Sequence, residues 1–178
     1  MSSLIKFLLM PILSLLLTTS ALCTPSSLND VLLEMHKVGS ASFKFLFWSV
    51  YEAELYADQQ FFSFTPLPVF ILNINYQRTF KSDQLIKEIE KQLIKADPIQ
   101  VELHRSWINK LVDILSDVEK GDMLSLYVDE NQHSSFYLNL DYLGTIDDEK
   151  FSISFSSIWL ARNDHYANFS RELTGIKQ

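Results

Sequence analysis

The run VFILNINY at 69–76 is the most strand-like stretch of the sequence, and the segments around it limit the fold. It is rich in the β-branched and aromatic residues that favour strands. Two segments follow whose apolar residues recur every three or four positions, which predicts amphipathic helices over 82–97 and 101–115. Further strand-like runs lie at 39–47, 50–56, 123–128 and 135–140. The order of strands, two helices, a hairpin and more helices predicts an α+β fold rather than a regularly alternating α/β fold.

Residues typical of turns and of helix starts divide the last third of the chain into a hairpin and two helices. The polar run DENQHS predicts a hairpin loop, and Gly144 predicts the turn that closes after the second hairpin strand. Asp147, Asp148 and Glu149 place negative charge where a helix N-terminus favours it. A helix is therefore expected to start there, and a last short helix is expected over 166–173.

The first residues have the pattern of a secretory signal peptide. Lys6 precedes the apolar run FLLMPILSLLL, and the small-residue stretch TTSALCT follows it. The apolar run is too short for a helix across a bilayer core of about 30 Å, which needs about 20 residues. We expect a signal peptide over 1–23 and a single mature domain over 24–178, with no integral membrane segment after cleavage.

The one cysteine, Cys23, lies at the predicted cleavage region. Cleavage after Ala21 and cleavage after Cys23 both fit the small-residue stretch. Leu22 is bulkier than the residue that normally precedes a lipoprotein cysteine, which argues against lipid anchoring. The mature domain therefore has no internal disulfide, and export without disulfides indicates a bacterial periplasm.

Composition and motifs exclude several kinds of function. The net charge of −7 argues against nucleic-acid binding, and four glycines leave no glycine-rich phosphate loop. The histidines lie far apart in the sequence, so no metal site is predicted; they are His36, His104, His133 and His165. His104 lies near the apolar face of its helix, where we expect a partly buried side chain with satisfied hydrogen bonds. We expect no metal, no cofactor and a monomeric protein.

Five stretches in this order resemble the exported bacterial branch of the chalcone isomerase-like family. They are VGSASFKFLFWSVYEAELYA, LNINYQRTF, GDMLSLYV, SFYLNLDYLGTIDDEKF and SSIWLARN. The resemblance runs from about Val38 to Ile176. It implies an open-faced β-sandwich, in which a layer of helices covers an antiparallel sheet and a hydrophobic cleft lies between them.

The resemblance also bears on catalysis. In the plant enzymes of this family, a cation and hydroxyl groups stabilise oxyanion charge during ring closure. The matching region GSASFKFLFWSVY contains no arginine, and Lys44 is its only cation, without the planar fork of a guanidinium. Tyr51 aligns with the hydroxyl residue of the enzymes, and a tyrosine there is similar to the fatty-acid-binding relatives. The resemblance thus implies a non-catalytic protein that binds a fatty acid or another small hydrophobic ligand.

The fatty-acid-binding relatives hold a carboxylate with arginine and tyrosine side chains. That pattern makes Lys44, Tyr51, Tyr76 and Arg78 the predicted ligand-binding residues, and no catalytic residue is predicted. Strand alternation turns Tyr51 toward the core and Tyr56 outward. Three of the candidates also fit a structural role: Tyr51 as a core tyrosine, Arg78 in a surface ion pair and Lys44 as a solvated lysine.

Two other functions stay open at this point. One is an intramolecular lyase or isomerase that acts on a small phenolic or enone substrate, with Lys44 or Arg78 as the oxyanion partner. The other is a structural or interaction protein whose own side chains fill the cleft. A cation inside a closed apolar cavity favours the first, and the absence of a cavity of roughly 300 Å³ or more favours the second.

Overall fold

The strands of the chain form one antiparallel sheet in which each strand pairs with its neighbour in sequence, in the order β1-β2-β3-β4-β5-β6. The computed structural model describes residues 27–175 apart from 61, 65 and 162–166. The predicted signal peptide, Cys23 and His165 lie outside these residues. The strands are β1 (His36–Phe45), β2 (Trp48–Ala57), β3 (Phe70–Tyr76), β4 (Met123–Val128), β5 (His133–Leu138) and β6 (Asp141–Asp147).

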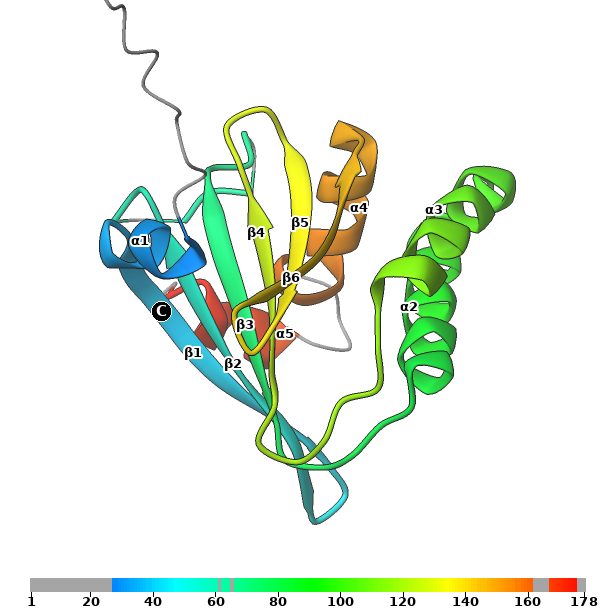
Figure 1. Cartoon of the computed structure of the whole chain (residues 1–178), viewed down its shortest axis with the longest axis horizontal. Helices are drawn as coiled ribbons and strands as arrows, with labels where there is room; N and C mark the ends of the chain where they lie inside the picture. The colour runs from blue at the N-terminus through cyan, green and yellow to red at the C-terminus, as the bar shows by residue number, and fades with distance from the viewer. Residues whose placement is uncertain (1–26, 61, 65, 162–166, 176–178) are drawn as a thin grey trace, which may run out of the picture.

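In the described residues, one helix precedes the strands, two lie between β3 and β4, and two follow β6. They are α1 (Leu28–Leu33), α2 (Ser82–Ala96), α3 (Val101–Ile114), α4 (Glu149–Leu160) and α5 (Ala167–Leu173). The helices α2 and α3 lie side by side and form a hairpin at one side of the molecule, and α4 stands between that hairpin and the sheet (Figure 1). This arrangement confirms the predicted α+β fold, with an antiparallel sheet and an accompanying layer of helices.

One face of the sheet is apolar and carries the helices. Leu55, Leu72, Leu126 and Phe136 are register partners across four neighbouring strands, and all four are buried. Phe155 of α4 meets the Phe136 ring edge-on at 5.5 Å between centroids. Apolar side chains at alternate positions of each strand therefore form the floor of the core.

The opposite face of the sheet carries more polar residues, although Ile71 on this face is fully buried. The neighbours of the apolar row on this face are Glu54, Asn73, Ser125 and Tyr137, which are register partners in the same way. Tyr56 points outward with the glutamates, as alternation predicts, and its hydroxyl donates to the Glu54 carboxylate at 3.0 Å.

The C-terminal helix α5 closes on β1 through a glycine. A Cβ atom at Gly39 would lie 2.4 Å from the carbonyl oxygen of Glu172 and 2.5 Å from that of Leu173. Only a residue without a side chain allows the helix backbone to approach the strand this closely. Phe169 of α5 then reaches the apolar face, where its ring contacts Phe43 edge-on.

The predicted turn at Gly144 is wrong. The β5–β6 turn lies at Asn139 and Leu140, whose φ angles are 52° and 77°, and Gly144 lies inside β6. Asparagine tolerates the left-handed conformation better than most residues, and the Asn139 side chain is also held in place. Its Oδ1 accepts from the Met123 backbone N–H at 2.9 Å. The sequence therefore did not predict β6, because a turn without glycine gives a weak local signal.

The start of α4 is fixed by hydrogen bonds, which confirms the acidic helix start. Asp148 is the N-cap and accepts from the backbone N–H groups of Lys150 at 2.9 Å and Phe151 at 3.2 Å. Burial opposes its ionisation, but these bonds and one from the Trp107 indole outweigh burial and hold the pKa of Asp148 below its usual value. Because Trp107 belongs to α3, its hydrogen bond to Asp148 connects α3 to the start of α4.

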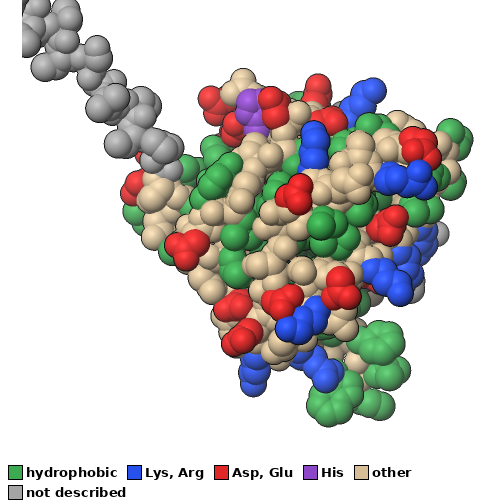
Figure 2. All heavy atoms as spheres, turned by 45° about the vertical axis from the view of Figure 1, so that its right-hand side comes forward, with side chains coloured by type: hydrophobic (Ala, Val, Ile, Leu, Met, Phe, Trp, Pro, Cys, Tyr) green, Lys and Arg blue, Asp and Glu red, His purple; other side chains and the backbone are tan. Residues whose placement is uncertain are grey.

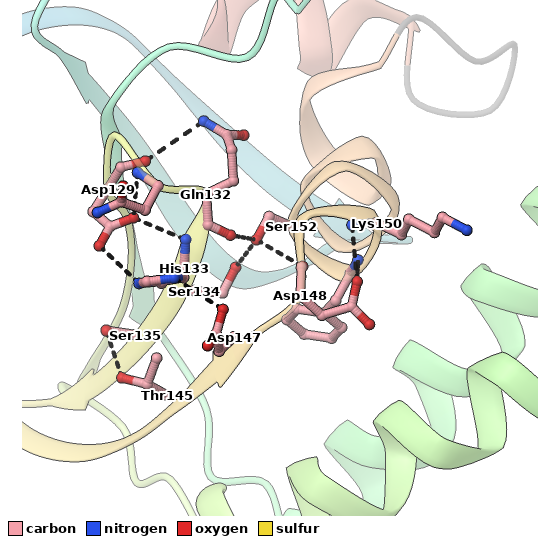
Figure 3. A network of polar contacts seen from close by, with 12 residues as sticks. Asp129, Gln132, His133, Ser134, Ser135, Thr145, Asp147, Asp148, Lys150 and Ser152 are labelled. Carbon is pink, nitrogen blue, oxygen red and sulfur yellow. Dashed lines mark hydrogen bonds and ion pairs between the residues drawn. The ribbon is translucent and has the colours of Figure 1, made fainter.

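A second polar network fastens α4 to the β4–β5 hairpin (Figure 3). The Ser152 hydroxyl of α4 lies 2.7 Å from the Ser134 hydroxyl and donates to the Gln132 carbonyl at 2.6 Å. His133 lies beside these residues, with Nδ1 3.2 Å from Asp129 and Nε2 2.9 Å from Asp147. The network holds α4 above the sheet and does not line the cavity that α4 helps to form.

Candidate functional site

A cavity of about 870 Å³ lies between the apolar face of the sheet and the helices α2 and α4. Its floor includes Leu72, Ile74, Leu126 and Phe136. This volume lies within the range of about 300–1,000 Å³ that is usual for small-molecule pockets. The chain's own side chains therefore leave the space between sheet and helices open, in disagreement with the alternative of a filled cleft.

Helical spacing supplies the other walls of the cavity. Leu85 and Ile89 are four positions apart on α2, so both point toward the sheet. Phe155 and Trp159 have the same spacing on α4, and their rings contact each other at 5.2 Å between centroids. The amphipathic pattern that predicted α2 thus also predicts which of its faces the cavity meets.

Tyr51 lies in the wall of the cavity. Its ring stacks on Phe43 at 5.1 Å between centroids, and its hydroxyl accepts a hydrogen bond from the Trp159 indole N–H at 3.2 Å. The side chain is half-buried. The Tyr51 ring therefore packs in the wall, and its hydroxyl is a polar group in an otherwise apolar surface.

Tyr76 lies next to Tyr51 in the same wall, with 6.1 Å between the ring centroids. Only 7% of its surface is exposed. Burial raises the pKa of the Tyr76 hydroxyl far above its usual value, since the charged phenolate is poorly solvated there. The hydroxyl is therefore a neutral O–H group at physiological pH.

Arg78 lines the cavity from the segment between β3 and α2, but it is exposed. Its guanidinium carbon lies 5.1 Å from the centre of the Trp48 ring, within the usual range of about 6 Å for a cation–π contact. Lys44 is also exposed and does not line the cavity, because it alternates with Phe43 and Phe45, which do. The structure thus brings Tyr51, Tyr76 and Arg78 together and leaves Lys44 apart.

Sequence reasoning missed a polar stripe on α2. Exposed polar residues line the cavity beside its apolar wall, and together with Arg78 we call them the cavity rim: Gln84, Glu88, Lys91 and Lys95. They recur every three or four positions, next to Leu85 and Ile89. The stripe is visible in the sequence, but it does not distinguish a cavity rim from a solvated helix face. Lys91 pairs with Glu88 at 3.1 Å, as helix neighbours commonly do.

His104 is not part of the cavity. It is 2% exposed, so it is more deeply buried than the partly buried side chain that was expected, and its ring lies 5.4 Å from the Trp107 ring between centroids. Its Nδ1 has no protein hydrogen-bond partner, so the expectation of a fully satisfied histidine is wrong. Among residues that the structure describes, no group of histidine, cysteine, aspartate and glutamate is arranged to hold a metal ion.

None of the helices in the described part of the chain has the length and hydrophobicity that crossing a bilayer requires.

Comparison with known proteins defines the class to which this fold and cavity belong. The chalcone isomerase-like family model matches residues 28–175. The chain therefore belongs to the chalcone isomerase-like family, as its motifs predicted. No curated protein sequence matches it.

A solved structure with the same fold is that of a fatty-acid binding protein from Arabidopsis thaliana. The two chains are 12% identical and superpose with a TM-score of 0.58, over 85% of this chain and 91% of that chain. At this identity the likeness establishes the fold.

Proposed function

We propose that this chain is a non-catalytic binding protein that holds a fatty acid in its cavity, and that its signal peptide directs it to the periplasm. The observation that carries the proposal is an apolar cavity of about 870 Å³ with an arginine at its rim. The acyl chain occupies the space between the sheet and the helices α2 and α4. The fatty-acid binding of the Arabidopsis structural neighbour supports the same ligand class.

The rim is the physically favourable place for the carboxylate. Burying an isolated carboxylate among Leu72, Ile74 and Phe136 would be costly, because no charge there compensates for lost water. At the rim the carboxylate stays hydrated and meets the Arg78 guanidinium, which matches it in a bidentate geometry. The hydroxyls of Tyr51 and Tyr76 lie deeper and supply polar contacts for water or for a functional group of the ligand.

The position of the cations argues against the lyase or isomerase alternative. Oxyanion stabilisation requires a preorganised positive charge in a site from which water is excluded. Lys44 and Arg78 are both exposed, and Lys44 does not line the cavity. The Tyr51 hydroxyl is also engaged by Trp159. A hydrophobic ligand with an ionised headgroup fits this arrangement better than a reaction that develops negative charge inside it.

Displacement of a fluorescent fatty acid from delipidated protein tests the proposal. Saturated acids of increasing length should compete more strongly by about fourfold per methylene, until the cavity is full, because each buried methylene contributes about 0.8 kcal/mol. Arg78→Ala should weaken binding several-fold, whereas Lys44→Ala, the matched exposed cation outside the cavity, should not. Absence of displacement by every saturated acid in the series would exclude the proposed ligand class.

A further inference from the structure

The end of the β1–β2 hairpin carries four consecutive large apolar residues in solvent. Their exposed fractions are 64% for Phe45, 76% for Leu46, 97% for Phe47 and 62% for Trp48. We call these residues the hairpin tip. Figure 1 shows the hairpin projecting beyond the other strands, and Figure 2 shows a hydrophobic protrusion at the bottom of the molecule with basic side chains near it.

Folding does not account for the composition of the hairpin tip. Leu46 has a φ of 54°, a left-handed conformation that glycine and asparagine adopt far more readily than leucine in such a turn. Phe47 buries almost nothing. The chain thus keeps two large apolar side chains where they add no core packing and where one of them strains the backbone. A contact outside the folded domain explains them better.

Two cations lie beside the hairpin tip. Lys44 is the only charged residue between 40 and 51 in the sequence, and it is exposed. Arg78 reaches the tip from another segment, with its guanidinium against the Trp48 ring. The chain as a whole carries a net charge of −7. A local pair of cations around aromatic residues in an acidic protein is complementary to an anionic surface that has an apolar interior.

We propose that the hairpin tip docks on the surface of an anionic phospholipid bilayer. Leu46 and Phe47 enter the boundary between headgroups and acyl chains, and Trp48 lies at headgroup level, where tryptophan is enriched in membrane proteins. Lys44 and Arg78 contact lipid phosphates. This docking uses the hairpin tip, which borders the cavity through Phe45 and Arg78, and it does not depend on which ligand the cavity holds.

Docking in this orientation also places the cavity near the lipid. Phe45 and Arg78 belong to the hairpin tip or contact it, and both line the cavity. An apolar molecule that leaves the bilayer would then reach the cavity rim with little exposure of its acyl chain to water. The geometry points to exchange of ligand with a membrane rather than with bulk solvent.

Flotation of the delipidated mature chain with vesicles tests this inference. Vesicles of phosphatidylethanolamine and phosphatidylglycerol should carry the wild-type protein, and phosphatidylcholine vesicles should carry less. Higher salt should weaken the binding to anionic vesicles. Tryptophan fluorescence should shift to shorter wavelength on binding, because Trp48 leaves water. Trp107 is already buried, and the partly buried Trp159 lines the cavity rather than the hairpin tip.

The informative variant is Leu46→Asn with Phe47→Ser, since asparagine accommodates the positive φ at position 46. It should keep the thermal stability and the fatty-acid displacement curve of the wild type and lose at least tenfold in affinity for anionic vesicles. Leu33→Ser with Ile99→Ser removes two other exposed apolar side chains and should leave vesicle binding unchanged. Lys44→Glu should weaken binding to anionic vesicles only.

Equal flotation of the tip variant and the wild type would overturn the inference, and so would a wild-type protein that binds neither kind of vesicle. Sedimentation of the free protein tests whether the tip instead binds a second copy of the chain. A dimer that is lost in the tip variant, without vesicle binding by the wild type, would assign the tip to a contact between two copies and would also overturn the inference. A normal displacement curve in any of these cases leaves the cavity function standing, so the two proposals fail separately.

Discussion

Trp159 of α4 donates its indole N–H to the Tyr51 hydroxyl of β2 at 3.2 Å, across 108 positions of sequence. Tyr51 belongs to the sheet wall of the cavity and Trp159 to the helix wall. Their hydrogen bond thus ties the helix layer to the sheet beside the space that a ligand would occupy. It also leaves a polar spot in an apolar wall.

A double-mutant cycle should measure the coupling free energy between Tyr51 and Trp159. Tyr51→Phe and Trp159→Phe should each lower the free energy of unfolding, and the double variant should lose about 0.5–1.5 kcal/mol less than the sum of the two, the net worth of a typical hydrogen bond. Urea denaturation followed by circular dichroism gives the three values. Strict additivity would mean that the two groups are not coupled.

Filling the cavity should abolish ligand binding with little effect on folding. Leu124 of β4 lines the cavity, and its register partner Leu138 of β5 does not. Leu124→Phe should reduce fatty-acid affinity at least tenfold, because the added ring takes up acyl-chain space, while stability changes by less than about 1.5 kcal/mol. The matched variant Leu138→Phe should keep the affinity of the wild type. Equal losses in both variants would place the ligand elsewhere.

Asp148 should stabilise the fold in a pH-dependent way. Its folded pKa is lowered from the usual value, so its contribution is fully present above the unfolded pKa of about 3.9 and is lost as pH falls through the folded pKa. Asp148→Ala should cost about 1–2 kcal/mol at pH 7, the usual worth of an N-cap. Thermal unfolding from pH 7 down to pH 2 should show the gap to the wild type closing in acid, and the exposed Asp141→Ala should show no such gap. A gap that stays constant to pH 2 contradicts the assignment.

Gly39→Ala should destabilise the contact between α5 and β1. The new Cβ atom would lie 2.4 Å from a backbone oxygen of Glu172, which no side-chain rotation relieves. A loss of about 1–3 kcal/mol is expected, as for other overpacked positions. Ser40→Ala, at the exposed neighbouring position, is the control for the thermal denaturation. An unchanged melting temperature for Gly39→Ala would show that the helix is free to move away.

Local patterns predicted the parts of the fold that local physics fixes. Alternation turned Tyr51 inward with Leu55, and the acidic residue Asp148 did start a helix. The turn at Asn139 and Leu140 was missed, because tertiary hydrogen bonds to Asn139 stabilise it in place of glycine. Periodicity alone predicted only the α+β class. The family motifs predicted the particular fold within that class.

The site was predictable only in part, for a related reason. Tyr51, Tyr76 and Arg78 follow from strand positions and family motifs, and they do line the cavity. Lys91 and Lys95 look like any solvated helix residues in the sequence. Whether a polar stripe faces bulk water or a cavity depends on where α2 packs, and a single sequence does not contain that information.

The most direct test of the central claim uses palmitate labelled with ¹³C at its carboxyl carbon and added to the delipidated protein. The account predicts one bound carboxyl resonance that saturates at one equivalent. It should titrate at lower pH than the same resonance in the Arg78→Ala variant, because a nearby guanidinium favours the carboxylate. A spectrum that contains only the signals of free and aggregated palmitate would contradict the account.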